Sequence, residues 1–189
     1  AMELYSNGPA VSGVPPVSII RTGGTLLGAG VQSNVQNVIA DDFTVTGAPW
    51  TVERLFFFSY QSFAASAFTF TGVTWSVVAG DVTTGVVVSS GTSPVTNAGL
   101  EGYRVSPTTL TNTDRAIFRI GVDVTDFVLP PGNYWLRWSL AGTLASGPWQ
   151  PPTADGVIGN AAQSVSNASF VPLVDAGDTL GIAAPFVTD

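Results

Sequence analysis

The chain has 189 residues, of which 45% are hydrophobic and only 10% are charged, and its formal net charge is −7. It contains no Lys, His or Cys, so all 6 positive charges are Arg. The missing Cys and His exclude disulfides and Ser-His or Cys-His nucleophiles, and they argue against a zinc or copper site. The negative charge argues against nucleic acid and anionic membranes as partners, and no run approaches the ~18 apolar residues that span a bilayer.

The first part of the chain, residues 1–35, is rich in Gly and Pro. We expect this segment to add an edge strand or to form an arm exchanged between copies. The length suits a single domain, residues 1–189. A weakly charged chain rich in Thr, Ser, Gly and Val is typical of a secreted β-protein, so we expect an extracellular or cell-surface location.

From residue 35 onward the apolar residues follow a period of two, which predicts strands separated by turns. Residues 51–60 are apolar on both faces in their middle, as in a central strand covered on both sides. The clearest alternation is at residues 116–124. There Ala116, Phe118, Ile120, Val122 and Val124 are predicted to point inward, and Ile117, Arg119, Gly121 and Asp123 outward.

The run from Leu129 to Gly132 contains two prolines and a glycine and predicts a sharp corner directly before a strand. A Leu-x-Pro-Gly run just before Tyr134 resembles the tyrosine corner of Greek-key sandwiches, in which the phenol is hydrogen-bonded back to the backbone. The strand should place Tyr134, Leu136, Trp138 and Leu140 on one face and Trp135, Arg137 and Ser139 on the other. With roughly eight to ten strands, the sequence predicts an all-β fold, an antiparallel two-sheet sandwich of jelly-roll type.

Several segments together resemble a β-sandwich module of secreted bacterial proteins that often precedes a PEP-CTERM-type surface-sorting tail. The segments are Leu4 to Pro9, Ala40 to Val45, Tyr103 to Ser106, Asn112 to Arg115, the corner with its strand, and Ser146 to Trp149. The resemblance implies an exported, non-catalytic module whose ligand is generally unassigned.

Asp41 and Asp42 are candidate metal ligands. Asp41 has the parity of Phe43, so its carboxylate should point inward, where it must be paired, hydrogen-bonded or metal-bound. One interpretation is a structural calcium site completed by oxygen ligands from another Asp-rich segment, residues 112–114, 123–126 or 175–178. The other is that Asp41 accepts hydrogen bonds or pairs with Arg54, without any cofactor.

A first candidate ligand site combines Arg119, Trp135 and Arg137. If the strand at residues 116–124 pairs with the strand after the corner, these side chains form a patch on an otherwise acidic protein. The patch would suit a sugar, a uronate or a protein carboxylate. The alternative is a surface without a ligand.

A second candidate ligand site is Trp149, which lies between Pro148 and Pro151 with Gln150 beside it. A proline-flanked indole is a preorganised platform on which a sugar ring can stack, and Gln150 could bind its hydroxyls. The alternative is that Trp149 closes the end of the sandwich.

These residues favour a secreted, non-enzymatic binding module with polysaccharide or a cell-surface glycan as its ligand. The alternative from another class is a structural subunit of a surface layer, sheath or filament that self-associates by strand addition along open sheet edges. A jelly-roll glycoside hydrolase is the third hypothesis, because Leu100-Glu101-Gly102-Tyr103 resembles the acid/base segment of family 11 glycoside hydrolases. Such an enzyme needs two carboxyl groups, and the second Glu setting of that family is missing here, so the sequence favours Glu101 as a solvated charge at a strand edge.

Overall fold

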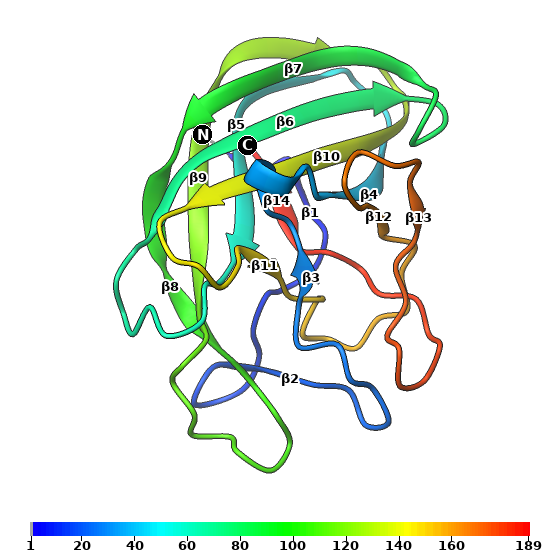
Figure 1. Ribbon diagram of the computed structural model, residues 1–189. Helices are drawn as coiled ribbons and strands as arrows, with labels where there is room; N and C mark the ends of the chain where they lie inside the picture. The colour runs from blue at the N-terminus through cyan, green and yellow to red at the C-terminus, as the bar shows by residue number, and fades with distance from the viewer. Residues whose placement is uncertain (1) are drawn as a thin grey trace.

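The computed structural model describes residues 2–189 and consists almost entirely of β-strands (Figure 1). The strands are β1 (Tyr5–Ser6), β2 (Val17–Ile19), β3 (Ala29–Gly30), β4 (Val38–Val45), β5 (Trp50–Ser59), β6 (Phe70–Ala79), β7 (Val86–Pro94), β8 (Thr96–Val105), β9 (Ala116–Leu129), β10 (Gly132–Gly142), β11 (Trp149–Gln150), β12 (Ala162–Ser164), β13 (Val171–Pro172) and β14 (Phe186–Thr188). Within this range the only helical element is the 3-10 turn η1 (Ser33–Val35), and no helix is long and apolar enough to cross a membrane.

The strands form two six-stranded sheets that face one another, together with the pair β11–β3 (Figure 1). The first, called here the β5 sheet, has the order β1-β14-β5-β9-β8-β2, and the second, the β10 sheet, has the order β13-β12-β4-β10-β6-β7. The antiparallel pairs are nested along the chain: β1 with β14, β4 with β10, β5 with β9, and β6 with β7. Nested pairing over two sheets is the jelly-roll arrangement, which confirms the predicted fold class.

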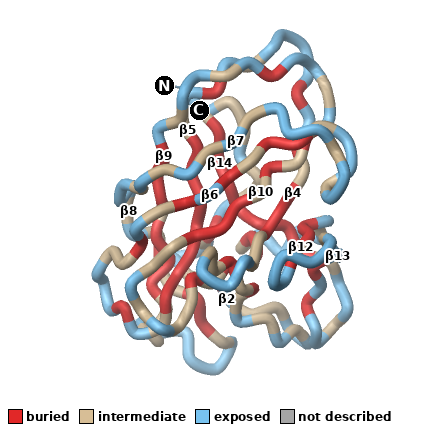
Figure 2. The backbone as a smooth tube through the Cα atoms, turned by 45° about the horizontal axis from the view of Figure 1, so that its top comes forward, coloured by how far each residue is buried: buried red, intermediate tan, exposed pale blue. Residues whose placement is uncertain are grey.

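The core lies between the sheets and is built from alternate residues of the long strands, which appear as buried runs in Figure 2. All residues of β9 that were predicted to point inward belong to this core or pack against it: Ala116, Phe118, Ile120, Val122 and Val124. The same holds on β10 for Tyr134, Leu136, Trp138 and Leu140. Burial of a Val, Leu, Ile or Phe side chain stabilises the fold by about 1.5–3 kcal/mol, so the alternation fixes which face of each sheet turns inward.

The outer face of the β5 sheet is also covered. Phe56 and Phe58 of β5 pack there with Ala10 and with Ile117 of β9. The prediction that residues 51–60 form a central strand covered on both sides is therefore confirmed. Ile117 was predicted to point outward, and it does lie on the outer face, but its exposed fraction is 0% because the N-terminal segment covers it.

The N-terminal segment supplies both edges of the β5 sheet. β1 pairs with β14 in the antiparallel direction, and β2 pairs with β8 in parallel. The segment lies close to β8 at Gly102, where any Cβ atom would collide with the carbonyl of Pro16. Residues 1–35 thus hold edge strands of their own chain, and exchange between copies stays a prediction.

The corner before β10 has the predicted geometry. The Tyr134 hydroxyl donates a hydrogen bond of 2.8 Å to the carbonyl of Pro130, four residues earlier. Its ring stacks on Phe43 of β4 with 5.6 Å between the ring centroids. The tyrosine corner is confirmed, and it fixes the point at which the chain passes from the β5 sheet to the β10 sheet.

Candidate functional site

The outer face of the β10 sheet carries a groove of about 580 Å³, called here the outer groove. It is lined by Val38, Thr74, Trp75, Ser76, Thr83, Ser90, Gly91, Thr92, Arg137, Ser139, Ser164 and residues 167–170. The strand register explains the hollow. Arg137 lies opposite Ala40 on β4 and Ser76 on β6, and Ser76 lies opposite Ser90 on β7, so small side chains surround one long one.

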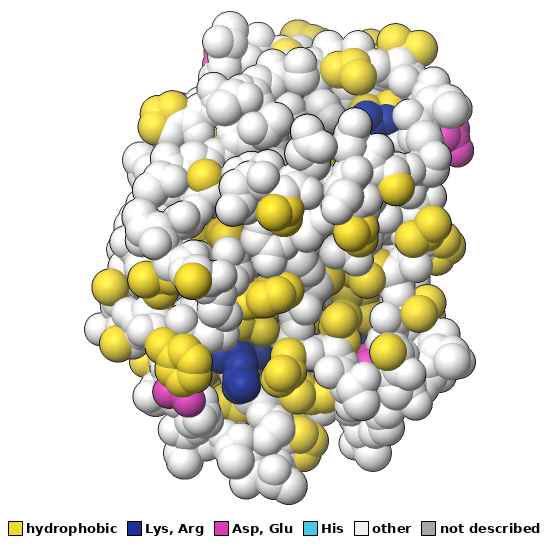
Figure 3. Space-filling view, in the orientation of Figure 1, with side chains coloured by type: hydrophobic (Ala, Val, Ile, Leu, Met, Phe, Trp, Pro, Cys, Tyr) yellow, Lys and Arg dark blue, Asp and Glu magenta, His cyan; other side chains and the backbone are white. Residues whose placement is uncertain are grey.

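Most residues that line the groove carry a hydroxyl or an amide, and one, Arg137, is charged. Its lining includes the hydroxyl residues Thr74, Ser76, Thr83, Ser90, Thr92, Ser139, Ser164 and Ser169, the amide of Asn167 and the single charge of Arg137. Figure 3, which views this side of the molecule, shows mostly uncharged polar groups and backbone with scattered hydrophobic side chains. Ser139 and Ser164 are buried, and Ser164 already donates to the carbonyl of Ala168. Each of the other six hydroxyls can both donate and accept a hydrogen bond, so the surface can match a ligand that presents several hydroxyls.

Two loops close one end of the groove over Arg137. The guanidinium lies over the Phe170 ring, 5.3 Å from its centroid, and donates a hydrogen bond of 3.3 Å to the Thr83 carbonyl. The Thr83 hydroxyl in turn accepts a hydrogen bond of 3.2 Å from the backbone amide of Phe170. The loop between β6 and β7 and the loop between β12 and β13 are therefore joined through one threonine.

Arg137 keeps unused hydrogen-bonding capacity in this position. Its Nε atom has no partner among residues 2–189. Burial lowers the pKa of Arg137, and the nearby Asp81 carboxylate acts in the opposite direction. Hydrogen bonds from Thr84 and Thr83 lower the pKa of Asp81, so this carboxylate stays ionised beside the closed end.

The predicted patch of Arg119, Trp135 and Arg137 is wrong. β9 pairs with β5 and β8, whereas β10 pairs with β4 and β6, so Arg119 lies on the other sheet. Its guanidinium covers the Phe56 ring at 4.1 Å from the centroid. Trp135 does share the outer face of β10 with Arg137, but it lies opposite Asp42, beside the groove and outside its lining.

Trp149 borders a second hollow, of about 480 Å³, called here the Trp149 hollow. Its backbone amide and carbonyl both pair with Tyr60, and its indole N–H donates a hydrogen bond of 3.1 Å to the Ser146 hydroxyl. Half-buried, the side chain also packs against the cluster of Phe56 and Phe58. Trp149 covers apolar residues and also lines an open hollow, and its role as a platform for a sugar ring stays a prediction.

The predicted role of Gln150 as a ligand-binding residue is wrong. Its exposed fraction is 0%. The side-chain carbonyl accepts a hydrogen bond of 3.0 Å from the indole N–H of Trp138, and the side-chain amide donates to the carbonyl of Pro151. Gln150 satisfies a buried tryptophan, so its polar atoms are already used inside the protein.

Asp41 is buried as predicted, but the groups around it do not fit a calcium ion. Its carboxylate accepts hydrogen bonds from the backbone amides of Ala184 and Asp42, at 2.6 and 2.8 Å, and from the Asn7 side chain, at 2.8 Å. These N–H donors occupy the positions that a cation would need. Arg54 pairs with Asp123 at 2.8 Å, which leaves hydrogen bonding as the role of Asp41.

Within residues 2–189, no other acidic group completes a metal site with Asp41. Asp42 alternates with Asp41 along β4 and lies opposite Trp135 on the outer face. In the part of the chain that the structure describes, no three Asp, Glu, His or Cys residues are grouped so that they could hold a metal ion.

A scan against models of known protein families and a search of curated proteins find no match to this chain. The resemblance to a module ahead of surface-sorting tails therefore stays a prediction. A fold alone does not identify a function, so the function must be argued from the two hollows.

Sequence reasoning missed most of the groove. Thr74 and Ser76 alternate on β6, and Ser90 and Thr92 alternate on β7, which is the visible signal of a polar outer face. The register that places Thr74 opposite Thr92 could not be read from the sequence. Phe170 lies in a loop whose position depends on Thr83, 87 residues earlier, so no local pattern indicates it.

Proposed function

We propose that this protein is a secreted, non-enzymatic binding module that holds a polysaccharide chain in the outer groove. The observation that carries the proposal is the lining of the groove: a field of hydroxyls and one amide, with one cation and one aromatic ring at its closed end. Sugars present hydroxyls around an apolar ring face, so they need both kinds of group.

The chemistry of the groove disfavours other small ligands. Pockets for apolar molecules are lined mainly by hydrophobic and aromatic side chains with few polar groups. Here eight of the fifteen lining residues are Ser or Thr, so hydrogen-bonding groups are spread over the whole lining. A regular strand surface also suits an extended chain better than a compact molecule.

The groove supports binding rather than hydrolysis. A glycosidase needs two carboxyl groups on either side of the bond that it breaks, and the residues lining the groove include no Asp or Glu. Glu101, the residue of the glycosidase hypothesis, lies on β8 in the other sheet.

Affinity electrophoresis on a panel of neutral and acidic polysaccharides tests the proposal. An open polar groove should bind with a Kd of about 10 μM to 1 mM. We expect at least one polysaccharide to retard the protein. Ser90→Trp places an indole in the groove and should abolish most of this retardation.

The matched control for that variant is Thr125→Trp, at an exposed position on β9 of the other sheet. It should be retarded like the parent protein. Equal retardation of the parent protein and Ser90→Trp would show that the polysaccharide binds outside the groove. If no polysaccharide retards the protein, the proposal that its ligand is a polysaccharide is wrong.

A second candidate function, a structural subunit that assembles by strand addition, is favoured by β7. Three of the four outermost strands, β1, β2 and β13, have only two or three residues, whereas β7 has nine. Val86, Val87 and Val88 are 70%, 51% and 45% exposed on it, and β7 carries no charged residue. Long uncharged edges are templates for pairing with another chain.

The mass of the protein in solution separates the two candidates. A binding module stays monomeric at concentrations where a subunit assembles. If assembly occurs and Val87→Lys prevents it, the structural role replaces the binding role.

A further inference from the structure

The Trp149 hollow is formed by segments that lie far apart in the sequence. It is lined by residues 25–28, Tyr60, Ser62, Arg115, Ser146, Trp149 and Ala176. None of these residues lines the outer groove, so the two hollows are separate places on the molecule.

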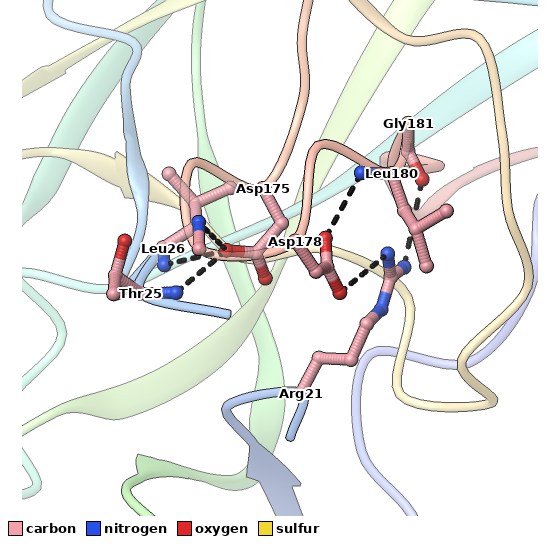
Figure 4. Close-up of polar contacts among 8 residues, drawn as sticks. Arg21, Thr25, Leu26, Asp175, Asp178, Leu180 and Gly181 are labelled. Atoms are coloured by element: carbon pink, nitrogen blue, oxygen red, sulfur yellow. Dashed lines mark hydrogen bonds and ion pairs between the residues drawn. The ribbon is translucent and has the colours of Figure 1, made fainter. Parts of the chain in front are cut away.

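One wall of this hollow, residues 25–28, is fixed by two buried residues of opposite charge. The Asp175 carboxylate accepts hydrogen bonds from the backbone amides of Thr25 and Leu26, as Figure 4 shows. The Arg104 guanidinium donates to the carbonyls of Leu26 and Leu27. Asp175 and Arg104 are both 1% exposed, so this short irregular segment is held from both sides by buried charged groups.

The loop after Asp175 is tied down in the same region. The Asp178 carboxylate lies 3.7 Å from the Arg21 guanidinium and accepts a hydrogen bond from the backbone amide of Leu180 (Figure 4). The wall and the loop are therefore ordered before any ligand arrives, which reduces the entropy lost on binding.

The position of the Trp149 side chain is also fixed by its neighbours. Gly28 allows the wall to approach it, because a Cβ atom at position 28 would lie 2.9 Å from Cβ of Trp149 and 2.7 Å from the Tyr60 hydroxyl oxygen. Gly147 has φ +93°, and a Cβ there would lie 2.8 Å from the indole. Two glycines and the Ser146 hydrogen bond thus position one aromatic ring at the hollow.

Arg115 supplies the charge of the hollow. It is the cation whose guanidinium has no ion pair, hydrogen bond or aromatic ring as a partner within residues 2–189, whereas each of the other Arg residues has at least one. The buried Arg104 is close enough to act on it electrostatically, since the charge of Arg115 lowers the pKa of Arg104. Asp175 offsets the charge of Arg104 in the buried wall, so Arg115 is the charge in the lining of the hollow that can attract an anion.

We propose that the Trp149 hollow binds a carboxylated sugar residue, a uronate. The sugar ring stacks on Trp149, and its carboxylate pairs with Arg115. The hydroxyls of Thr25, Ser62 and Ser146 line the same hollow and can bind those of the ring. This inference rests on the proposed function in taking a polysaccharide as the ligand, and it adds a second site with its own chemical selectivity.

The test compares oligogalacturonate with its methyl-ester form, which has the same ring and no charge, by calorimetric titration. The parent protein should bind the acid about tenfold more tightly than the ester, the gain expected of one charge-assisted hydrogen-bonded pair. Arg115→Gln should lose this preference. The control Arg119→Gln removes an equal charge on the β5 sheet and should keep it.

Arg115→Gln breaks no side-chain hydrogen bond, ion pair or cation–π contact within residues 2–189, so it should fold like the parent protein. Acid and ester bound equally by the parent, or an acid preference that survives Arg115→Gln, would overturn the uronate site. Acetate bound as well as the sugar acid would also overturn it, because the hollow would then be a simple anion site. Binding of a neutral polysaccharide that Ser90→Trp abolishes would leave the outer groove intact in each case, whereas binding of neither kind removes both proposals.

Discussion

The outer groove and the Trp149 hollow have similar sizes, about 580 and 480 Å³, but they are built differently. The groove lies mainly on β4, β6, β7 and β10, whose hydrogen-bonded ladders fix every backbone position. Its shape comes from small side chains on a regular surface. The hollow is made mostly of loops, and the course of those loops depends on a few buried polar groups, above all Arg104 and Asp175.

This difference determines how each place should respond to substitution. In the groove, support is spread over many ladder hydrogen bonds, so one lost contact changes the shape little. In the hollow, each buried charged residue satisfies several backbone groups, so one loss leaves several groups without partners.

The largest effect should come from Arg104→Met, which removes the cation that satisfies the wall of the hollow. It leaves the carbonyls of Leu26, Leu27 and Ile19 without that donor and Asp175 without its nearby positive charge. We expect a loss of about 3–5 kcal/mol in the free energy of unfolding, measured in urea.

Arg104→Lys is the matched control, because it keeps the charge but cannot reach all of these acceptors at once. Its free energy of unfolding should lie between those of the parent protein and Arg104→Met. A loss below about 1 kcal/mol for Arg104→Met would mean that the wall is held by other contacts, and the contrast between the two regions would fail.

Asp41 provides a pH-dependent effect on the strand-built side. Burial raises the pKa of Asp41 to about 7, although hydrogen bonds from Ala184, Asp42 and Asn7 act in the opposite direction. In the unfolded chain the carboxyl titrates near its ordinary value of about 4. Between these values the folded state binds more protons, so the stability from this group is present at pH 4 and is lost as the pH rises to about 7.

The measurement is the free energy of unfolding of the parent protein and Asp41→Asn from pH 4 to pH 8. The difference between them should change by at most about 1.4 kcal/mol per pH unit, the limit for one proton, and should level off above pH 7. A pH-independent difference would mean that the three hydrogen bonds keep Asp41 ionised throughout.

The smallest effect should come from Tyr134→Phe. It removes the hydrogen bond to Pro130 but leaves the ring on Phe43. We expect a loss of about 0.5–1.5 kcal/mol in the free energy of unfolding and no change in polysaccharide binding by the groove. Weakened binding would show that the groove depends on the corner, against the idea of distributed support.

The fold was predictable because its signals are local. Alternation on β9 and β10 depends on neighbouring residues, and the Tyr134 corner lies within five residues of chain. Strand partners are set by long-range packing, so the sequence could not show that β9 and β10 belong to different sheets. The wrong placement of Arg119 beside Arg137 follows directly from that limit.

The two hollows show the same limit at the level of single residues. Trp149 was recognisable from its prolines, and Arg137 from its parity on a strand. Arg104 and Asp175 hold the same wall of the hollow although they lie 71 residues apart in the sequence, which no periodicity reveals. No local pattern marks Arg115 as part of this hollow either. Gln150 was predicted to bind a ligand because it is polar and next to Trp149. Its side-chain carbonyl instead accepts a hydrogen bond from the buried indole N–H of Trp138 on another strand.

The most direct test of the central claim is to follow backbone amide resonances while a binding oligosaccharide from the polysaccharide panel is added. We expect the largest chemical-shift changes on the face formed by Thr74, Ser76, Ser90, Thr92 and Arg137. The chemical shifts of the β5 sheet should change little or not at all. Chemical-shift changes only at Val86–Val88 of β7, or only at residues outside the groove, would contradict the assignment of the outer groove as the polysaccharide site.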